Sequence, residues 1–293
     1  MVVDPAAAVT VDAPSEGRVA SIRAADGYEL SYRVWAPAPG AARATLVLFN
    51  GVMSHSLWFA PLAGPLVSAG FKVVGADRRG TGLATQARGD APDAKTLLDD
   101  ARAIVARERL PARPLHLGGW CWGAILAINL AAEMPGEVQR LMLLAPGLYP
   151  TEPLKRRMAE QEGAARDEPQ PEDRPCLASP ISEEMFTSGP ALDAFIMKDP
   201  RRLALFTPRF AAIMSKLGMG ARLKLPKLQV PLLVVLASDD RATDNDETLR
   251  GIGKLTGSRA VFRTIAGAHG LQFDAPDALA RAIAEFAPAD AAP

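Results

Sequence analysis

The stretch GGWCWGA, residues 118–124, joins two apolar segments of the 293-residue chain and places one of its two cysteines between glycines. The apolar residues 114–118 before it have the length of a buried strand, and the apolar run 122–134 after it has the length of a helix. Glycines stand two positions either side of Cys121, where side chains would collide with neighbouring elements in a tight turn. We therefore predict a sharp strand-to-helix turn that holds the Cys121 sulfur at a helix N-terminus, a position that favours negative charge.

Strand-like and helix-like segments alternate along the chain, which is typical of an α/β protein with a mostly parallel sheet flanked by helices. An antiparallel hairpin is expected first, at residues 18–24 and 28–36, with Asp26-Gly27 as its turn. The later expected strands cover residues 43–49 without the arginine, 71–76, 114–118, 139–145, 231–237 and 259–265, and the expected helices cover 57–69, 93–109, 122–134 and 275–287.

The alternating pattern is interrupted between residues 150 and 226. Helical pieces there surround a charged, Pro-rich loop at 166–175, and no convincing strand is present. A helical insert of this kind in an α/β sheet is commonly a cap over the active site. We therefore expect residues 150–226 to form a helical cap on a core made of 18–149 and 227–293. Residues 1–17 have no basic segment of a signal peptide and are expected to be a disordered leader.

Composition excludes several classes of protein. The 33 basic and 33 acidic side chains give a formal net charge of zero, so no global positive field would attract nucleic acid or anionic lipid. No apolar stretch reaches the roughly 18 residues that a membrane span needs, and two cysteines are too few for a disulfide framework. The three histidines are far apart, so we expect no metal and no cofactor, and a cytoplasmic location fits best. The short basic runs are interpreted as solvated faces: Arg78-Arg79, Lys155-Arg156-Arg157 and Arg201-Arg202.

A cysteine nucleophile would need a base, and that base would need an acid to orient it. His269 follows the last expected strand, at the sheet edge where α/β proteins bind ligands, and is the expected base. The other histidines suit the role less well, because His55 precedes the turn and His116 lies within an expected strand. The alternative interpretation of Cys121 is a small packed hydrophobic side chain, the usual role of a buried cysteine. Cys176 lies in a polar loop and is interpreted as incidental.

The acid is expected in the acidic segment that follows the strand 231–237. Asp240 is favoured there, since it lies just beyond the small residues at the strand end. Two neighbours compete with it. Asp239 would face solvent or cap a turn in the alternative interpretation, and Asp244 would cap the next helix. The resulting order along the chain is nucleophile, acid and histidine.

With these residues the chain resembles the α/β-hydrolase superfamily, and more closely its monoacylglycerol lipase and lysophospholipase branch, over most of residues 25–290. The resemblance implies an α/β-hydrolase fold, with Asp240 as acid and His269 as base. It also implies an oxyanion hole made by the backbone N–H groups of Val52 and Trp122. The matching motifs are Asn50-Gly51-Val52 with His55-Ser56, Asp77-Arg78-Arg79-Gly80-Thr81-Gly82, the turn around Cys121, Asp240-Arg241 with Asp244, and Gly267-Ala268-His269.

Two residues depart from the pattern of that branch. Asn50-Gly51 stands where the branch usually has His-Gly, which leaves an oxyanion hole of backbone donors intact. Cys121 stands where the branch has serine. A cysteine at this turn is known in dienelactone hydrolases and polyhydroxyalkanoate synthases. A cysteine would form a thioester intermediate, which suits hydrolysis, transfer to an acceptor, and thioester substrates on CoA or a carrier protein. We therefore expect an acyl-processing enzyme, a hydrolase (esterase or thioesterase) or an acyltransferase, acting on an ester or thioester with an apolar moiety.

Large apolar side chains in the predicted cap and near Cys121 have two interpretations. They would line a substrate pocket for an apolar group, or they would form a small separate core under the cap. A non-catalytic scaffold that binds an apolar small molecule is the alternative function, although such a protein has no need of a catalytic triad. The residues expected to line the pocket are Met53, Trp120, Leu148, Phe186, Phe210 and Met214.

Overall fold

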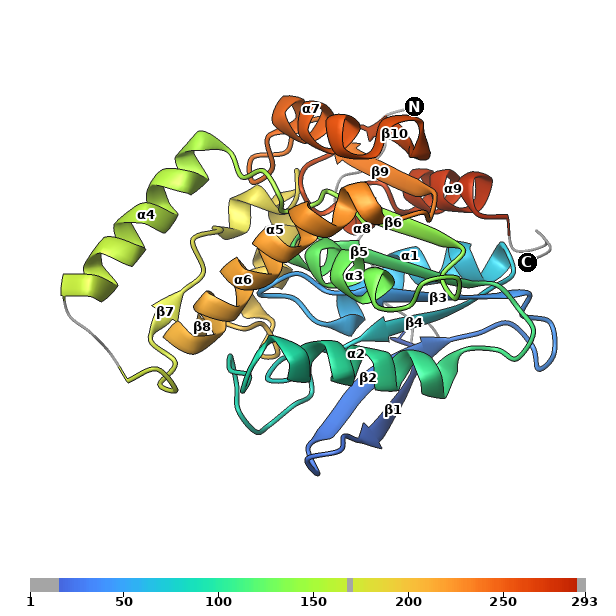
Figure 1. Ribbon diagram of the computed structural model, residues 1–293, viewed down its shortest axis with the longest axis horizontal. Coiled ribbons are helices and arrows are strands. Elements are labelled where there is room, and N and C mark those ends of the chain that lie inside the picture. Colours follow the sequence, from blue (N-terminus) through green and yellow to red (C-terminus); the bar gives the residue numbers. More distant parts are fainter. Residues whose placement is uncertain (1–15, 168–170, 289–293) are drawn as a thin grey trace.

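The computed structural model describes residues 16–167 and 171–288, so nearly all of the expected leader at 1–17 lies outside the described residues (Figure 1). An eight-stranded sheet forms the centre, in the order β1-β2-β4-β3-β5-β6-β9-β10. β1 and β2 are an antiparallel hairpin, β2 pairs antiparallel with β4, and all further neighbours are parallel. The strands are β1 (Arg18–Arg23), β2 (Glu29–Trp35), β3 (Ala44–Phe49), β4 (Phe71–Ala76), β5 (Leu115–Trp120), β6 (Arg140–Leu144), β9 (Leu232–Ala237) and β10 (Ala260–Ile265).

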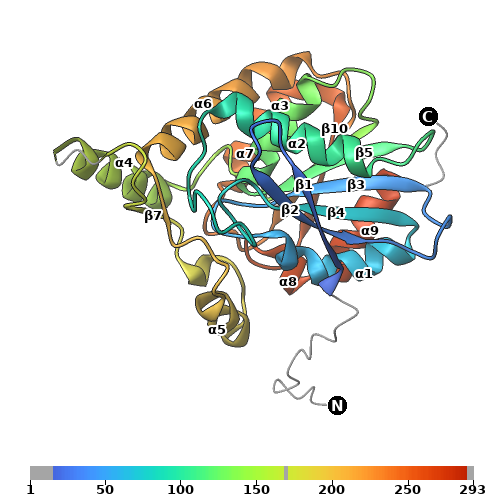
Figure 2. The same ribbon diagram turned by 90° about the horizontal axis from the view of Figure 1, so that it is seen from below.

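Helices cover both faces of the sheet, as the view from below in Figure 2 shows. β3 explains why two layers are needed, because its side chains are buried on both faces: Leu46 and Leu48 face one core and Val47 and Phe49 face the other. The first layer consists of α1 (Ala60–Ser68), α8 (Leu271–Asp274) and α9 (Pro276–Phe286), and the second of α2 (Ala94–Glu108), α3 (Trp122–Ala132) and α7 (Asn245–Thr256). Short 3₁₀ helices are η2 (Ser56–Phe59), η3 (Glu183–Met185), η4 (Leu225–Lys227) and η5 (Gly257–Arg259).

The predicted strands and helices of the core are present, with their ends shifted by one or two residues. The mostly parallel sheet flanked by helices confirms the expected fold class. The expected helix 57–69 is divided into η2 and α1, and β5 continues two residues further than expected, to Trp120. The expected helices did not include bounds for α7. Asp244 caps this helix, because the Asp244 carboxylate accepts a hydrogen bond from the Glu247 amide (2.8 Å).

The insert between β6 and β9 contains α4 (Glu152–Asp167), α5 (Pro190–Lys198) and α6 (Pro208–Lys224). The expectation of no strand in this region was wrong, because β7 (Leu177–Ala178) and β8 (Leu205–Phe206) pair antiparallel. α6 lies along α3, buries Phe210 and Leu217, and receives a hydrogen bond at the Leu217 carbonyl from the Asn129 side chain (2.9 Å). α6 is therefore packed as a core helix, whereas α4 and β7 extend to one side of the sheet (Figure 1).

The turn from β5 to α3 has the tight geometry that its glycines predict. Cys121 has φ +56° and ψ −121°, a left-handed conformation that side-chain-bearing residues rarely adopt. Hydrogen bonds from its amide to the Leu144 carbonyl (3.0 Å) and from the Gly147 amide to its own carbonyl (3.1 Å) hold this conformation. A Cβ at Gly119 would lie 2.1 Å from the Gly123 carbonyl oxygen, so the chain has room only for glycine there.

Gly123 gives a direct test of this constraint. A Cβ at Gly123 would lie 2.0 Å from the Phe49 carbonyl oxygen, which is backbone and has little room to shift. We expect Gly123→Ala to lower the free energy of unfolding by about 3 kcal/mol or more, measured by urea denaturation. Gly64→Ala is the matched control: it lies in α1 with no atom near its Cβ, and we expect stability to change by at most about 1 kcal/mol, toward greater stability. Equal stability of the two variants would contradict the packing described here.

Candidate active site

Cys121, Asp240 and His269 come together at the carboxyl ends of β5, β9 and β10. His269 Nδ1 lies 3.0 Å from Asp240 Oδ1 and 2.9 Å from Oδ2, and both side chains are fully buried. Cys121 is 5% exposed. The three residues that were expected to form a triad therefore lie close together, with His269 between Asp240 and Cys121, although they come from distant segments of the chain.

The surroundings of His269 raise its pKa. Burial lowers the pKa, but the charges of Asp240 and Cys121 and the hydrogen bond to Asp240 outweigh burial and raise the pKa to about 10. Nε2, the nitrogen that does not contact Asp240, has no hydrogen-bond partner of ordinary geometry among the described residues. This nitrogen is thus free to exchange a proton with a neighbouring group, while Asp240 fixes the orientation of the ring.

Further hydrogen bonds hold Asp240 and His269 in place. Asp240 Oδ1 accepts from the amides of Ala242 and Thr243, both at 2.8 Å, which fixes the orientation of its carboxylate. The indole N–H of Trp120 donates to the His269 carbonyl at 2.8 Å, so the residue directly before Cys121 holds the histidine loop in place. The triad is therefore supported from both the β5 and the β9 loops.

The competing residues lie elsewhere. Asp239 is exposed and accepts a hydrogen bond from Ser238, and Asp244 caps α7. His116 is buried within β5, where burial lowers its pKa to about 4, and neither ring nitrogen has a partner among residues 16–167 and 171–288. His55 pairs with Asp199. Only Asp240, of the three candidate acids, contacts His269.

Two backbone amides beside Cys121 are unpaired. Within the described part of the chain, neither the Val52 nor the Trp122 amide donates a hydrogen bond, and both residues line the same cavity as Cys121. The turn that carries Val52 is held from inside, since the Asn50 side chain donates to the Gly51 carbonyl at 3.1 Å. Asn50 thus stabilises the turn through its side-chain amide, which also donates to the Ser54 carbonyl.

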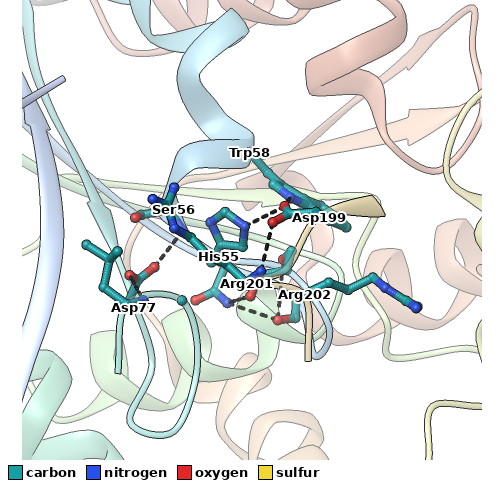
Figure 3. A network of polar contacts seen from close by, with 12 residues as sticks. His55, Ser56, Trp58, Asp77, Asp199, Arg201 and Arg202 are labelled. Atoms are coloured by element: carbon teal, nitrogen blue, oxygen red, sulfur yellow. Dashed lines mark hydrogen bonds and ion pairs between the residues drawn. The ribbon is translucent and has the colours of Figure 1, made fainter. Parts of the chain in front are cut away.

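The insert is anchored to this turn by a buried polar network that Figure 3 shows (Figure 3). Asp199, which ends α5, lies 2.7 Å from His55 Nε2 and accepts from the Trp58 indole at 2.7 Å. Burial raises the pKa of Asp199, but its contacts with His55 and Trp58 outweigh burial and lower it to about 2. The Leu203 amide donates to the Met53 carbonyl at 2.9 Å. No sequence pattern indicated Asp199, because a lone aspartate at a helix end resembles any solvated one.

A second anchor joins the insert to the histidine loop. The Gly270 amide donates to the Phe186 carbonyl at 2.5 Å. Asp274 accepts from the Ser188 hydroxyl at 3.0 Å and from the Ala268 amide at 2.8 Å, and so bridges the insert and the loop. Phe186 of the insert therefore lies beside the His269 ring, with 6.2 Å between the ring centroids.

A cavity of about 640 Å³ opens from Cys121 between the core and the insert. Of the residues predicted to bind substrate, Leu148 and Met214 line this cavity, whereas Met53, Trp120 and Phe186 line a second pocket beside Cys121 that has no room for a water molecule. Phe210 lines neither space, because α6 packs it against the Trp122 ring, with 5.7 Å between the ring centroids. The apolar lining of the cavity includes Val52, Ile125, Leu148, Leu154, Met158 and Met214.

The basic pair Arg78-Arg79 is buried, so its interpretation as a solvated face was wrong. Arg79 is 4% exposed and pairs with Asp26 and Asp100, each at 2.7 Å. Arg78 is 6% exposed and donates a hydrogen bond to the Val52 carbonyl.

Among the residues that the structure describes, no group of three or more His, Cys, Asp or Glu side chains could hold a metal ion. In the same residues, none of the helices has the length and apolar composition of a membrane span.

The strand order, the two helical layers and the turn after β5 define an α/β-hydrolase fold. The chain belongs to the family described as Serine aminopeptidase, S33, whose sequence profile matches residues 40–275.

Individual relatives agree with this assignment. The chain is 25% identical over 237 residues to human monoglyceride lipase, covering 75% of this chain and 73% of that protein. It is 34% identical over 116 residues to RutD of Variovorax paradoxus (strain S110), which is named as a carbamate hydrolase; that match spans 39% of this chain and only 41% of RutD. The structure resembles the monoacylglycerol lipase of Paleococcus ferrophilus, with a TM-score of 0.75, 18% identity, and coverage of 89% of this chain and 99% of the lipase.

The raised pKa of His269 predicts how the reactivity of Cys121 depends on this residue. An imidazolium that persists up to pH about 10 would favour negative charge on the neighbouring sulfur, so iodoacetamide should alkylate Cys121 faster in wild type than in His269→Ala at neutral pH. This difference should disappear as the pH rises through about 10, because His269 then loses its charge. In Asp240→Asn the difference should disappear at a lower pH, because a group that raises the His269 pKa is lost.

The measurement is peptide mass spectrometry after timed alkylation, with Cys176→Ala in every variant to remove the other thiol. Equal alkylation rates in wild type and His269→Ala at neutral pH would contradict an effect of the His269 charge on Cys121.

Proposed function

We propose that the protein is an acyl-processing enzyme in which Cys121 is the nucleophile, His269 the acid and base, and Asp240 the group that orients His269. One observation supports this most strongly: the Asp240–His269 pair leaves Nε2 unpaired beside Cys121, at the inner end of an apolar cavity. A buried cysteine with only a packing role would need neither a charged histidine nor a strained backbone.

In the first step, the Cys121 thiolate attacks the carbonyl carbon of an ester or thioester. A C–S bond forms, and the electron pair of the carbonyl moves to oxygen, where the unpaired Val52 and Trp122 amides can bind the negative charge. When the tetrahedral intermediate collapses, the bond to the alcohol or thiol breaks, and the His269 imidazolium protonates the leaving group. The product is an acyl group joined to Cys121 as a thioester.

In the second step, neutral His269 takes a proton from water or from an acceptor alcohol, amine or thiol. As His269 becomes imidazolium, that nucleophile adds to the thioester carbonyl; collapse of the intermediate then breaks the C–S bond and expels the Cys121 thiolate beside the imidazolium. Hydrolysis and transfer share this mechanism and differ only in the acceptor. The thioester favours acceptors other than water more than an oxygen ester would.

The cavity supports a substrate whose acyl group is apolar, since its lining is mainly aliphatic side chains and methionines. Human monoglyceride lipase, by its name, acts on a glyceride ester, which is the same class of substrate. Acyl thioesters on CoA or a carrier protein fit the same chemistry at the sulfur. The alternative, a non-catalytic scaffold for an apolar ligand, would leave the triad without a purpose.

The decisive experiment is intact-protein mass spectrometry after mixing with p-nitrophenyl butyrate and rapid quenching in acid. Wild type and Cys176→Ala should each gain one butyryl group, and Cys121→Ala should gain none, because the thioester forms only at Cys121. His269→Ala should react far more slowly, by about 100-fold or more. A wild-type protein that releases no p-nitrophenolate and carries no butyryl group would favour the scaffold function instead.

The cavity predicts a dependence on acyl length. Met214 lines the cavity from α6, so Met214→Asp should lower kcat/KM for p-nitrophenyl hexanoate by about tenfold more than for the acetate, as each buried methylene contributes about 0.8 kcal/mol. Met197→Asp is the control, because Met197 is 53% exposed on α5 and lies outside the cavity. Equal losses for both esters in Met214→Asp would show that the acyl group binds elsewhere.

A further inference from the structure

Arg78 is a buried cation whose contacts are unusual. It is 6% exposed, yet among the described residues no carboxylate lies within salt-bridge distance of its guanidinium. The adjacent Arg79 has two such partners, Asp26 and Asp100. Burial lowers the pKa of Arg78, and the nearby charge of Asp77 opposes the shift; an arginine still remains protonated at neutral pH. A buried charge without a carboxylate partner is costly and is often found at functional sites.

The guanidinium contacts both residues that carry the unpaired amides. Nη1 donates to the Gly51 carbonyl at 3.3 Å and Nη2 donates to the Val52 carbonyl at 3.0 Å. The same guanidinium lies over the rings of Trp122, at 5.4 Å from its centroid, and Phe210, at 4.6 Å. Arg78 therefore bridges the turn after β3 and the first residue of α3.

The geometry of the peptide group gives these contacts a consequence. The Gly51 carbonyl and the Val52 N–H belong to one planar trans peptide, so they point in opposite directions. A guanidinium on the carbonyl side therefore fixes the N–H on the opposite side and polarises it toward stronger donation. The turn also lies against the nucleophile, since a Cβ at Gly51 would be 3.3 Å from the Cys121 Cβ.

We infer that Arg78 is a positioning residue for the oxyanion hole: it orients and polarises the Gly51–Val52 peptide and holds it against Trp122. This inference rests on the proposed function, because it concerns the charge that develops on the carbonyl oxygen during acylation of Cys121. Arg78 acts through the two amides and does not itself contact the reacting atoms.

Two reactions at the same sulfur separate this role from simple packing. Acylation by p-nitrophenyl butyrate places negative charge on an oxygen, whereas alkylation by iodoacetamide displaces iodide at carbon and needs no oxyanion hole. Arg78→Met should therefore slow acylation of Cys121 by about 10- to 100-fold and leave the alkylation rate unchanged. Arg78→Lys keeps the charge but reaches only one carbonyl, and should give an intermediate acylation rate with unchanged alkylation. It decides the question if Arg78→Met does not fold.

Arg88→Met is the matched control. Arg88 likewise donates to backbone carbonyls, those of Gly82, Ala84 and Arg201, but it does not contact the turn that carries Val52. Both reactions should proceed at the wild-type rate in this variant.

The outcomes distinguish the two proposals. Acylation of Arg78→Met at the wild-type rate would overturn the role of Arg78 and leave the proposed function intact. An equal slowing of acylation and alkylation would also overturn it, since it would show that Arg78 only maintains the fold around Cys121. A wild-type protein that is alkylated but never acylated at Cys121 would overturn the proposed function, and the inference with it.

Discussion

The candidate site depends on how closely the start of α3 approaches the end of β3. Gly123 lies so near the Phe49 carbonyl that no side chain fits between them. This contact brings the turn after β3, with Val52, next to the turn after β5, with Cys121, and so places the amides of Val52 and Trp122 at one cavity. The left-handed backbone of Cys121 follows from the same constraint, because the chain must reverse into the helix within a single residue. The packing and hydrogen bonds of the surrounding sheet offset the free-energy cost of that strained backbone.

Much of this arrangement could be predicted from the sequence, for reasons that are local. The apolar runs of β3 and β5 and the glycines around Cys121 specify strands, a helix and a tight turn without knowledge of any distant residue. The pairing of Asp240 with His269 followed from topology, because both come after parallel strands and parallel strands end at one edge of the sheet. Whether Cys121 acts as a nucleophile stays a prediction, as do the oxyanion roles of Val52 and Trp122.

The features that were missed depend on contacts between distant segments. Arg78 and Arg79 are adjacent in a charged run that resembles a surface, and only the folded chain shows one paired with carboxylates and the other with carbonyls and aromatic rings. Phe210 has the composition of a pocket residue, but α6 packs against α3 and places it below the cavity. Asp199 contacts His55 across 144 positions of sequence, and no local pattern encodes such a pair.

Two anchors hold the insert beside the candidate site: the segment from Phe186 to Leu203 is tied at one end to the histidine loop and at the other to the turn after β3. The cavity at Cys121 reaches solvent between α4 and α6, where Met158 is 39% and Met219 is 64% exposed. A long acyl chain could thus project outward past these methionines while its carbonyl carbon reaches the sulfur. Because the methionines at this end are exposed, such a passage would set no sharp upper limit on chain length.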